Sequence, residues 1–427
     1  MLRFVLADLR RQRLGVAAIV LLVALATMLG VTVTLQERAI RLGSARAAAA
    51  FDLVIGAPGS ETQLVLSSVF LQPAPLPLLP AHLLAELRAD PKVAWAAPVG
   101  FGDFAGGLPI VGTTEELIAG LGGVTQGRSF ARLGEAVLGA AAPGAIGDQL
   151  HPLHGELHES DAAHAAVTYT VTGRLAATGT AWDRAVLVPI ETVWRLHGLG
   201  HHHEDEAAGE DHDQDHDHDQ EHDHDHDHDH EAHVDLQQPV DPAAVTGPEA
   251  AGLPAILVKP RSFAAAYKLR QAYRTAATMA VFPGEVLTRL YGMLGDARLV
   301  LALVASGAQA LVMAAILLAM TLHVLQRRRQ IGALRAFGAA RRVVFAIVWL
   351  EAFVVIGLGL VLGYGLGFLA SWLLAQRLAA ANGIGLPVAF LAEDGWSAFA
   401  LLALGALVAT VPALLAYRHA PAEALRA

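Results

Sequence analysis

Cysteine is absent from all 427 residues of the chain. Disulfide bonds, thiolate metal sites and cysteine nucleophiles are therefore excluded, although an oxidising compartment remains compatible with the sequence. The phosphate-binding patterns GxxxxGKS and GxxxxGKT, the zinc-protease pattern HExxH and any catalytic triad are absent as well. The sequence thus predicts no enzyme active site, and P-loop binding of ATP would require a separate chain.

Charged residues are also scarce. They make up 16% of the chain, against 54% hydrophobic residues and a mean hydropathy of +0.45. Because this is too apolar for an ordinary soluble protein, we predict an α+β membrane protein with four transmembrane helices and a large external domain. Four apolar segments are long enough to cross about 30 Å of hydrocarbon. They cover residues 14–35, 299–322, 343–374 and 396–415.

The first apolar segment is predicted to be a retained anchor. Its apolar run is longer than a typical signal-peptide core. No small-residue cleavage site precedes the polar residues Gln36-Glu37-Arg38 that follow it. A cleaved signal peptide is the less favoured alternative.

Arginines predict the orientation of the four segments. The clusters lie in residues 1–13, 323–342 and 416–427. Because positive charge favours the cytoplasmic side of a membrane, these three regions are predicted to be cytoplasmic. Residues 36–298 are then predicted to lie outside, as is the short loop 375–395, where Arg377 stands against Glu393 and Asp394.

The pattern of residues 36–298 is typical of a mixed α/β domain between the first two membrane segments. Alternating or continuous apolar runs predict strands at 51–55, 108–112, 169–175, 185–189 and 255–258. Helices are predicted at 81–89, 191–197 and 262–280. Residues 284–298 are expected to continue as a stalk into the second membrane segment.

A tract made almost entirely of histidine and acidic residues occupies 201–233. It holds 12 of the 20 histidines and 15 of the 40 acids, so without it the formal net charge changes from −10 to +5. Such residues build no core, and we expect residues 201–250 to be a disordered external insert in the absence of metal. The domain accommodates this insert as a loop between a helix and a strand.

Imidazole and carboxylate groups at alternate positions form a flexible ligand for Zn²⁺, with Cu(II) and Ni(II) as alternatives. Metal capture or sensing is the favoured interpretation, and a solvated linker with incidental affinity is the alternative. The candidate ligands are His201, His202, His203, His212, His216, His218, His222, His224, His226, His228, His230 and His233.

A second histidine group precedes the strand predicted at 169–175. It contains His151, His154, His158 and His164, together with Glu156, Glu159 and Asp161. His154 and His158 would share one face of a helix, but Gly155 weakens that helix. A metal site with three or four of these ligands and a polar loop with scattered histidines both remain open.

The loop at 323–342 and the helix after it carry a recognisable pattern. Residues 327–367 read RRRQIGALRAFGAARRVVFAIVWLEAFVVIGLGLVLGYGLG, which combines a basic cluster, Ile-Gly, Leu-Arg-Ala, Gly-Ala, a glutamate and a glycine ladder. The chain ends with PAEALR at 421–426, and the external region contains GAPGSETQLVLSSVF and VTGRLAATGTAWDRAVLVP. In these motifs the chain resembles the FtsX/MacB-like family of ABC-transporter permeases. The resemblance covers nearly all of the chain except 201–250, and Gln330 stands where the family often has Glu.

The resemblance implies a permease subunit of the bacterial inner membrane, with a periplasmic domain and both termini cytoplasmic. It implies a homodimer that works with two copies of an ABC ATPase, which hold the ATP, and that relays motion to the periplasmic domain by mechanotransmission. The implied ATPase-coupling residues are Arg327, Arg328, Arg329, Ile331, Gly332, Leu334, Arg335, Gly338 and Arg341. The alternative for this loop is a topology determinant that binds lipid headgroups.

The third membrane segment contains one acid and a regular series of glycines. Gly359, Gly363 and Gly367 recur at four-residue spacing, which lets another helix approach closely, either within the chain or across a dimer. Glu351 is costly in an apolar helix and is therefore a functional candidate. An ion pair with Arg341 or Arg342, or snorkelling to the interface, is the alternative to a functional role.

The sequence as a whole predicts a permease linked to handling of zinc or another transition metal. One alternative is export or extraction of a lipoprotein, lipid or peptide, with the histidine tract as a metal buffer. Another is a non-transporting regulator of a periplasmic partner. Candidate partners are the ATPase, a second copy of the chain, and a periplasmic metal-binding protein or lipoprotein, and we expect no nucleic acid.

Overall fold

The computed structural model describes residues 9–11, 13–153, 167–199, 235–247, 250–293, scattered positions between 299 and 321, and 339–418. The chain divides into two compact units. The first, here called the helical unit, comprises Met1–Gly43, Tyr291–Ala379 and Leu386–Ala427. The second, here called the α/β unit, comprises Ser44–Leu290 and Ala380–Gly385.

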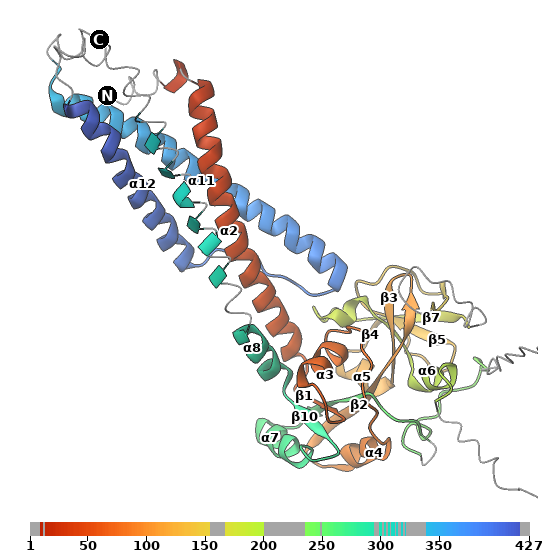
Figure 1. Cartoon of the computed structure of the whole chain (residues 1–427). Helices are drawn as coiled ribbons and strands as arrows, with labels where there is room; N and C mark the ends of the chain where they lie inside the picture. The colour runs from red at the N-terminus through yellow and green to blue at the C-terminus, as the bar shows by residue number, and fades with distance from the viewer. Residues whose placement is uncertain are drawn as a thin grey trace, which may run out of the picture. The chain divides into compact units, whose positions relative to one another are not determined.

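The helical unit contains three long apolar helices among its described residues (Figure 1). They are α2 (Arg13–Ala49), α11 (Arg341–Asn382) and α12 (Ala392–Arg418), and each is long and apolar enough to cross a membrane. The segment predicted at 299–322 is described at scattered positions only and does not enter this count. All three helices extend beyond the apolar segments predicted from the sequence.

Helix α11 packs against both of the other long helices (Figure 1). Val355 and Ile356 of α11 share a buried cluster with Val23 of α2 and Ala409 of α12. The Trp349 indole nitrogen also donates a hydrogen bond to a backbone carbonyl of α12, at 3.0 Å. Because its apolar side chains meet partners on two sides, α11 is the central helix of the three.

Among its described residues, the α/β unit is built on a ten-stranded mixed sheet. The strand order is β10-β1-β9-β2-β3-β8-β5-β7-β4, with β6 paired to β7. The strands are β1 (Leu53–Gly56), β2 (Val93–Ala105), β3 (Leu108–Thr113), β4 (Val124–Gly127), β5 (Glu135–Leu138), β6 (Gln149–Leu150), β7 (Tyr169–Leu175), β8 (Val186–Pro189), β9 (Ala255–Pro260) and β10 (Met279–Val281). The β3–β8 and β5–β7 pairs are parallel, and the other pairs are antiparallel.

The helices of this unit are short. They are α3 (Glu61–Ser68), α4 (His82–Ala89), α5 (Glu115–Gly120), α6 (Ile190–Leu196), α7 (Phe263–Ala272) and α8 (Pro283–Met293), with a 3₁₀ turn, η1 (Ala181–Arg184). Side chains alternate between the two faces of a strand. Accordingly Val54 of β1 joins one buried cluster, whereas Leu53 and Ile55 join another.

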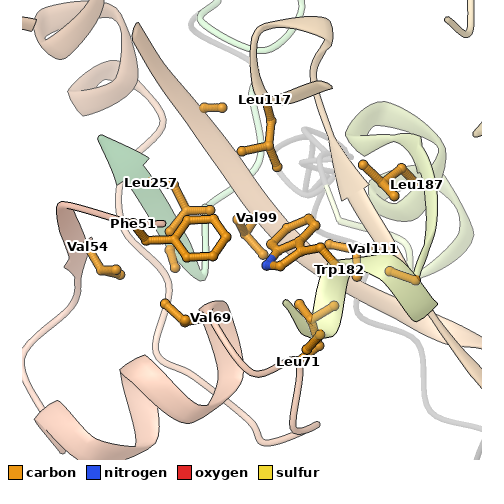
Figure 2. Close-up of a cluster of buried hydrophobic side chains, with 14 of the residues drawn as sticks. Phe51, Val54, Val69, Leu71, Val99, Val111, Leu117, Trp182, Leu187 and Leu257 are labelled. Atoms are coloured by element: carbon orange, nitrogen blue, oxygen red, sulfur yellow. The ribbon is translucent and has the colours of Figure 1, made fainter. Parts of the chain in front are cut away.

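The larger cluster is centred on Trp182 of η1, which is fully buried (Figure 2). Its ring lies 6.0 Å from that of Phe51, centroid to centroid. Val99 from β2 and Val111 from β3 are among the other buried side chains drawn in the figure. This core therefore joins Phe51, two residues after the end of α2, to strands β2 and β3 in the middle of the sheet.

The mixed α/β prediction is confirmed, and the five predicted strands correspond to β1, β3, β7, β8 and β9. The helix predicted over 262–280 is wrong beyond Ala272. There the Thr275 hydroxyl accepts hydrogen bonds from the backbone N–H groups of Ala277 and Thr278, at 3.2 and 3.1 Å. This turn lets residues 279–281 pair with β1 as strand β10.

Candidate functional site

The predicted ATPase-coupling loop is described at its C-terminal end only. Arg327 to Gly338 lie outside the described residues, as does the PAEALR motif. Arg341 is the first residue of α11, and both it and Arg342 are exposed. The described start of α11 therefore presents two cations to its surroundings.

Gly359, Gly363 and Gly367 of α11 lie directly against α2. A Cβ atom added to Gly359 or to Gly363 would lie 2.5 Å from the Cβ atom of Val23 or Thr27, respectively. At Gly367 the distance to the nearest α2 side chain would be 2.8 Å. Small residues let two helix backbones approach closely. Of the two alternatives for this glycine face, the structure contains the packing within the chain.

Glu351 is buried within α11, with 6% of its surface exposed. Arg342 precedes it by nine residues, which is about 13 Å along the helix axis at 1.5 Å per residue. The ion pair considered from the sequence is therefore out of direct reach, while the burial of this carboxyl keeps Glu351 a candidate for function.

Sequence reasoning missed an ion pair between α2 and the start of α12. The Arg38 guanidinium donates to both carboxylate oxygens of Asp394, at 2.7 and 3.1 Å, and both residues are buried. The same carboxylate accepts the backbone N–H of Leu391 at 2.7 Å. Two arginine–acid partners 356 positions apart carry no local sequence signal, so only the fold brings them together.

The candidate metal ligands lie mostly outside the described residues. These are His154, His158 and His164 of the histidine group at 151–164, and all twelve histidines of the tract at 201–233. His151 is described and exposed, and its Nδ1 lies 3.2 Å from the Thr168 hydroxyl. Within the described ranges there is no group of three or more His, Asp or Glu residues placed to hold a metal ion.

Both histidine-bearing segments start from neighbouring residues of strand β2. Leu153, between His151 and His154 of the group at 151–164, pairs with Phe104 through two backbone hydrogen bonds of 3.1 and 2.8 Å. His197, at the end of α6 and before the tract, has its Nε2 atom 4.0 Å from a carboxylate oxygen of Asp103. The two segments thus leave the α/β unit close together, which their separation in the sequence does not reveal.

The return from the histidine tract is also attached to this unit. The backbone N–H groups of Leu133 and Gly134 donate to the carbonyls of Gln238 and Leu236, at 3.0 and 2.9 Å. Further along, the Asp241 N–H donates to the Glu191 carboxylate at 3.1 Å. Burial raises the pKa of Glu191. Both ends of the tract therefore leave from ordered structure.

Glu135, at the start of β5, is held next to this return segment. It accepts two hydrogen bonds from Arg128, at 2.7 and 2.5 Å, and one from the Ala131 N–H at 2.7 Å. The Arg128 hydrogen bond is the largest influence and lowers the pKa of Glu135, with the backbone amides acting in the same direction. These contacts order the loop 128–135, on which residues 236–240 lie.

Residues 302–422 match the family described as FtsX-like permease C-terminal. The C-terminal part of the chain is thus similar to FtsX-like permeases. The matched region includes the predicted coupling loop together with all of α11 and α12. No curated protein matches the chain.

Among solved structures, the periplasmic region of MacB from Actinobacillus actinomycetemcomitans is similar to the chain. The match has a TM-score of 0.31 and 10% sequence identity, and it covers 57% of this chain and 95% of that one.

Proposed function

We propose that the chain is the permease subunit of an ABC transporter in the bacterial inner membrane, driven by a separate ATPase chain. The match of residues 302–422 to FtsX-like permeases carries the proposal. Three helices able to cross a membrane and a mixed α/β unit support it. The absence of a P-loop pattern from the sequence fits a division of labour in which another chain hydrolyses ATP.

In this proposal the basic residues at 327–341 dock on the ATPase, and two copies of the chain work with two ATPase subunits. ATP-driven movement of the loop is passed to α11, which begins at Arg341. Because Gly359, Gly363 and Gly367 of α11 lie close against α2, these two helices move as a packed pair. The movement then reaches the external α/β unit, which is the mechanotransmission step.

The experiment that tests the proposal is an ATPase assay on the complex purified through this chain and reconstituted in lipid. We expect ATP hydrolysis that is reduced at least tenfold in an Arg327→Glu, Arg328→Glu, Arg329→Glu variant, because the substitutions reverse the docking charge. Arg274→Glu, in the α/β unit, is the control for a charge reversal outside the loop and should retain activity. Equal hydrolysis by the loop variant and the wild type would overturn the coupling role.

We further propose that the histidine tract binds zinc outside the membrane and acts as an input to the transport cycle. Alternating imidazole and carboxylate ligands suit Zn²⁺. The origin of both histidine segments next to Asp103 and Phe104 supports the proposal, since bound metal could draw the segments together at one place on β2.

A zinc titration of the same ATPase assay tests this second step. The wild type is compared with a deletion of residues 201–233, and a deletion variant carrying a glycine–serine linker of equal length is the control. A zinc response present in the wild type alone supports the proposal. Identical responses in all three proteins would make the tract a passive buffer and would favour a lipoprotein, lipid or peptide as cargo.

A further inference from the structure

The last turn of α11 belongs to the α/β unit. Residues Ala380–Gly385 cluster with this unit, whereas the preceding part of the helix belongs to the helical unit. The Arg184 guanidinium donates to the backbone carbonyl of Ala380. Carbonyls in the last turn of a helix lack partners within the helix, and a cation there is favourable. Arg184 therefore caps the external end of α11.

The residues that follow α11 continue the contact. Gly383 has a φ of +72°, and a Cβ atom added there would lie 3.0 Å from the Thr180 carbonyl oxygen. Ile384 packs against the buried cluster that contains Trp182. Gly385 donates its N–H to the Gly179 carbonyl at 3.5 Å. The segment 380–385, here called the docked segment, is thus held by the backbone conformation of Gly383, the apolar side chain of Ile384 and the backbone N–H of Gly385.

The docked segment meets a stiff part of the α/β unit. The Asp183 carboxylate accepts hydrogen bonds from the N–H and hydroxyl groups of Thr178, at 2.8 and 2.7 Å, and from the Gly179 N–H at 2.8 Å. The Thr180 hydroxyl oxygen accepts a hydrogen bond from the backbone N–H of Trp182 at 3.3 Å. A turn closed by this many side-chain hydrogen bonds resists local deformation, so a force applied to it is passed on.

Trp182 links this turn to the end of α2. Its ring lies against Phe51, and the Phe51 N–H donates to the Ala48 carbonyl in the last turn of α2 at 3.1 Å. Phe51, after the end of α2, and Ile384, after the end of α11, therefore contact the same buried cluster, in which Trp182 lies beside Phe51 (Figure 2). Dense packing around Trp182 transmits a displacement from one side of the ring to the other.

We propose that residues Ala380–Gly385 are an external coupling element, which delivers the movement of α11 to the α/β unit at the Thr178–Arg184 turn. Arg184, Gly383 and Ile384 are its positioning residues. The movement of α11 in this inference rests on the proposed permease function. The contacts of Ala380–Gly385 with the Thr178–Arg184 turn do not depend on that function. Its consequence is that the α11 end joins the ends of α2 and α8 as a place where the α/β unit receives movement.

The docking is tested without any ATPase, by hydrogen exchange on the full chain in lipid nanodiscs. In Gly383→Ala, the new Cβ atom crowds Thr180 in a backbone conformation that alanine disfavours. We expect exchange of the amides at 178–183 to become at least tenfold faster. Gly385→Ala is the matched control, because a Cβ atom there meets open space, and its exchange should equal that of the wild type.

Ile384→Asp is a second variant, because it places a charge against the apolar cluster. It should accelerate exchange of the same amides, while amides of β9 stay protected. Unchanged exchange at 178–183 in both Gly383→Ala and Ile384→Asp would overturn the docking.

The coupling is then tested on the reconstituted ATPase complex. We expect the Gly383→Ala complex to hydrolyse ATP within about twofold of the wild-type rate. In the wild type and in Gly385→Ala, ATP should change the hydrogen exchange of the α/β unit, and Gly383→Ala should lose most of this change. A full response in Gly383→Ala would overturn the coupling role. Failure of the permease proposal is distinguishable, since the wild type itself would then lack any ATP-dependent change.

Discussion

Arg38 and Asp394 form a two-point ion pair between α2 and the start of α12, at 2.7 and 3.1 Å. Removal of one member of a buried pair leaves the other charge without compensation, at a cost of about 3–5 kcal/mol. We therefore expect Arg38→Ala to lower the unfolding free energy by this amount. Thermal unfolding in detergent, followed by circular dichroism, measures the change.

The control for this prediction lies one turn further along α2. Arg41 pairs with Glu37 at 3.4 Å, with both side chains partly exposed, so Arg41→Ala should cost less than about 0.5 kcal/mol. Arg38→Lys keeps the charge but loses the planar fork and should fall between the two. Equal losses in Arg38→Ala and Arg41→Ala would contradict the structural role of the pair.

Alanine substitutions at two glycines of α11 distinguish the effect of close helix packing from that of helix propensity. At Gly363 an alanine Cβ atom would lie 2.5 Å from Thr27, whereas at Gly365 it would meet nothing within 4 Å. We expect Gly363→Ala to lose about 1–3 kcal/mol through overpacking and Gly365→Ala to gain up to about 1 kcal/mol through helix propensity. Unfolding midpoints of the two variants in the same detergent decide the point, and stabilisation by both would be inconsistent with the packing.

Two glutamates of the α/β unit should respond to pH in opposite directions. The pKa of Glu135 is lowered, mainly by its hydrogen bonds with Arg128. The stability it adds is present above its unfolded pKa of about 4.3 and is lost as the pH falls through its folded value. Glu135→Gln should therefore destabilise the protein at pH 7 and change little at pH 3.

The pKa of Glu191 is raised by burial, so the sign is reversed. Its neutral form is favoured in the folded state, and that contribution is lost as the pH rises through the folded value. Glu191→Gln should therefore raise the unfolding temperature at pH 7, with the difference vanishing below about pH 4. A decrease at pH 7 for both variants would show that lost hydrogen bonds outweigh charge.

The sequence predicted the strands with simple apolar patterns but missed β2. Its residues include Pro98, Gly100 and Gly102, which local propensity disfavours in a strand. Pairing with β9 on one side and β3 on the other overrides that preference. Strand β10 was missed because an alanine-rich helical pattern continues past Ala272, and a threonine turn that ends it has little periodic signal.

The candidate site also contains some contacts that the sequence predicted and others that it did not. The four-residue spacing of Gly359, Gly363 and Gly367 predicted a close helix contact, and the structure supplies α2 as the partner. By contrast, Arg184 and Ala380 belong to distant parts of the chain and meet only because the fold places η1 next to the end of α11. Contacts that depend on tertiary placement lie beyond periodicity and motif spacing.

The central claim, that ATP hydrolysis on one side of the membrane moves the α/β unit on the other, has one direct measurement. Because the chain has no cysteine, Gly59→Cys, at an exposed site in the α/β unit, carries a single fluorophore. In the reconstituted ATPase complex, addition of ATP and orthovanadate should change its fluorescence. The change should be absent in the Arg327→Glu, Arg328→Glu, Arg329→Glu background. A complex that hydrolyses ATP with no fluorescence change from this label or from labels elsewhere on the unit would contradict the account.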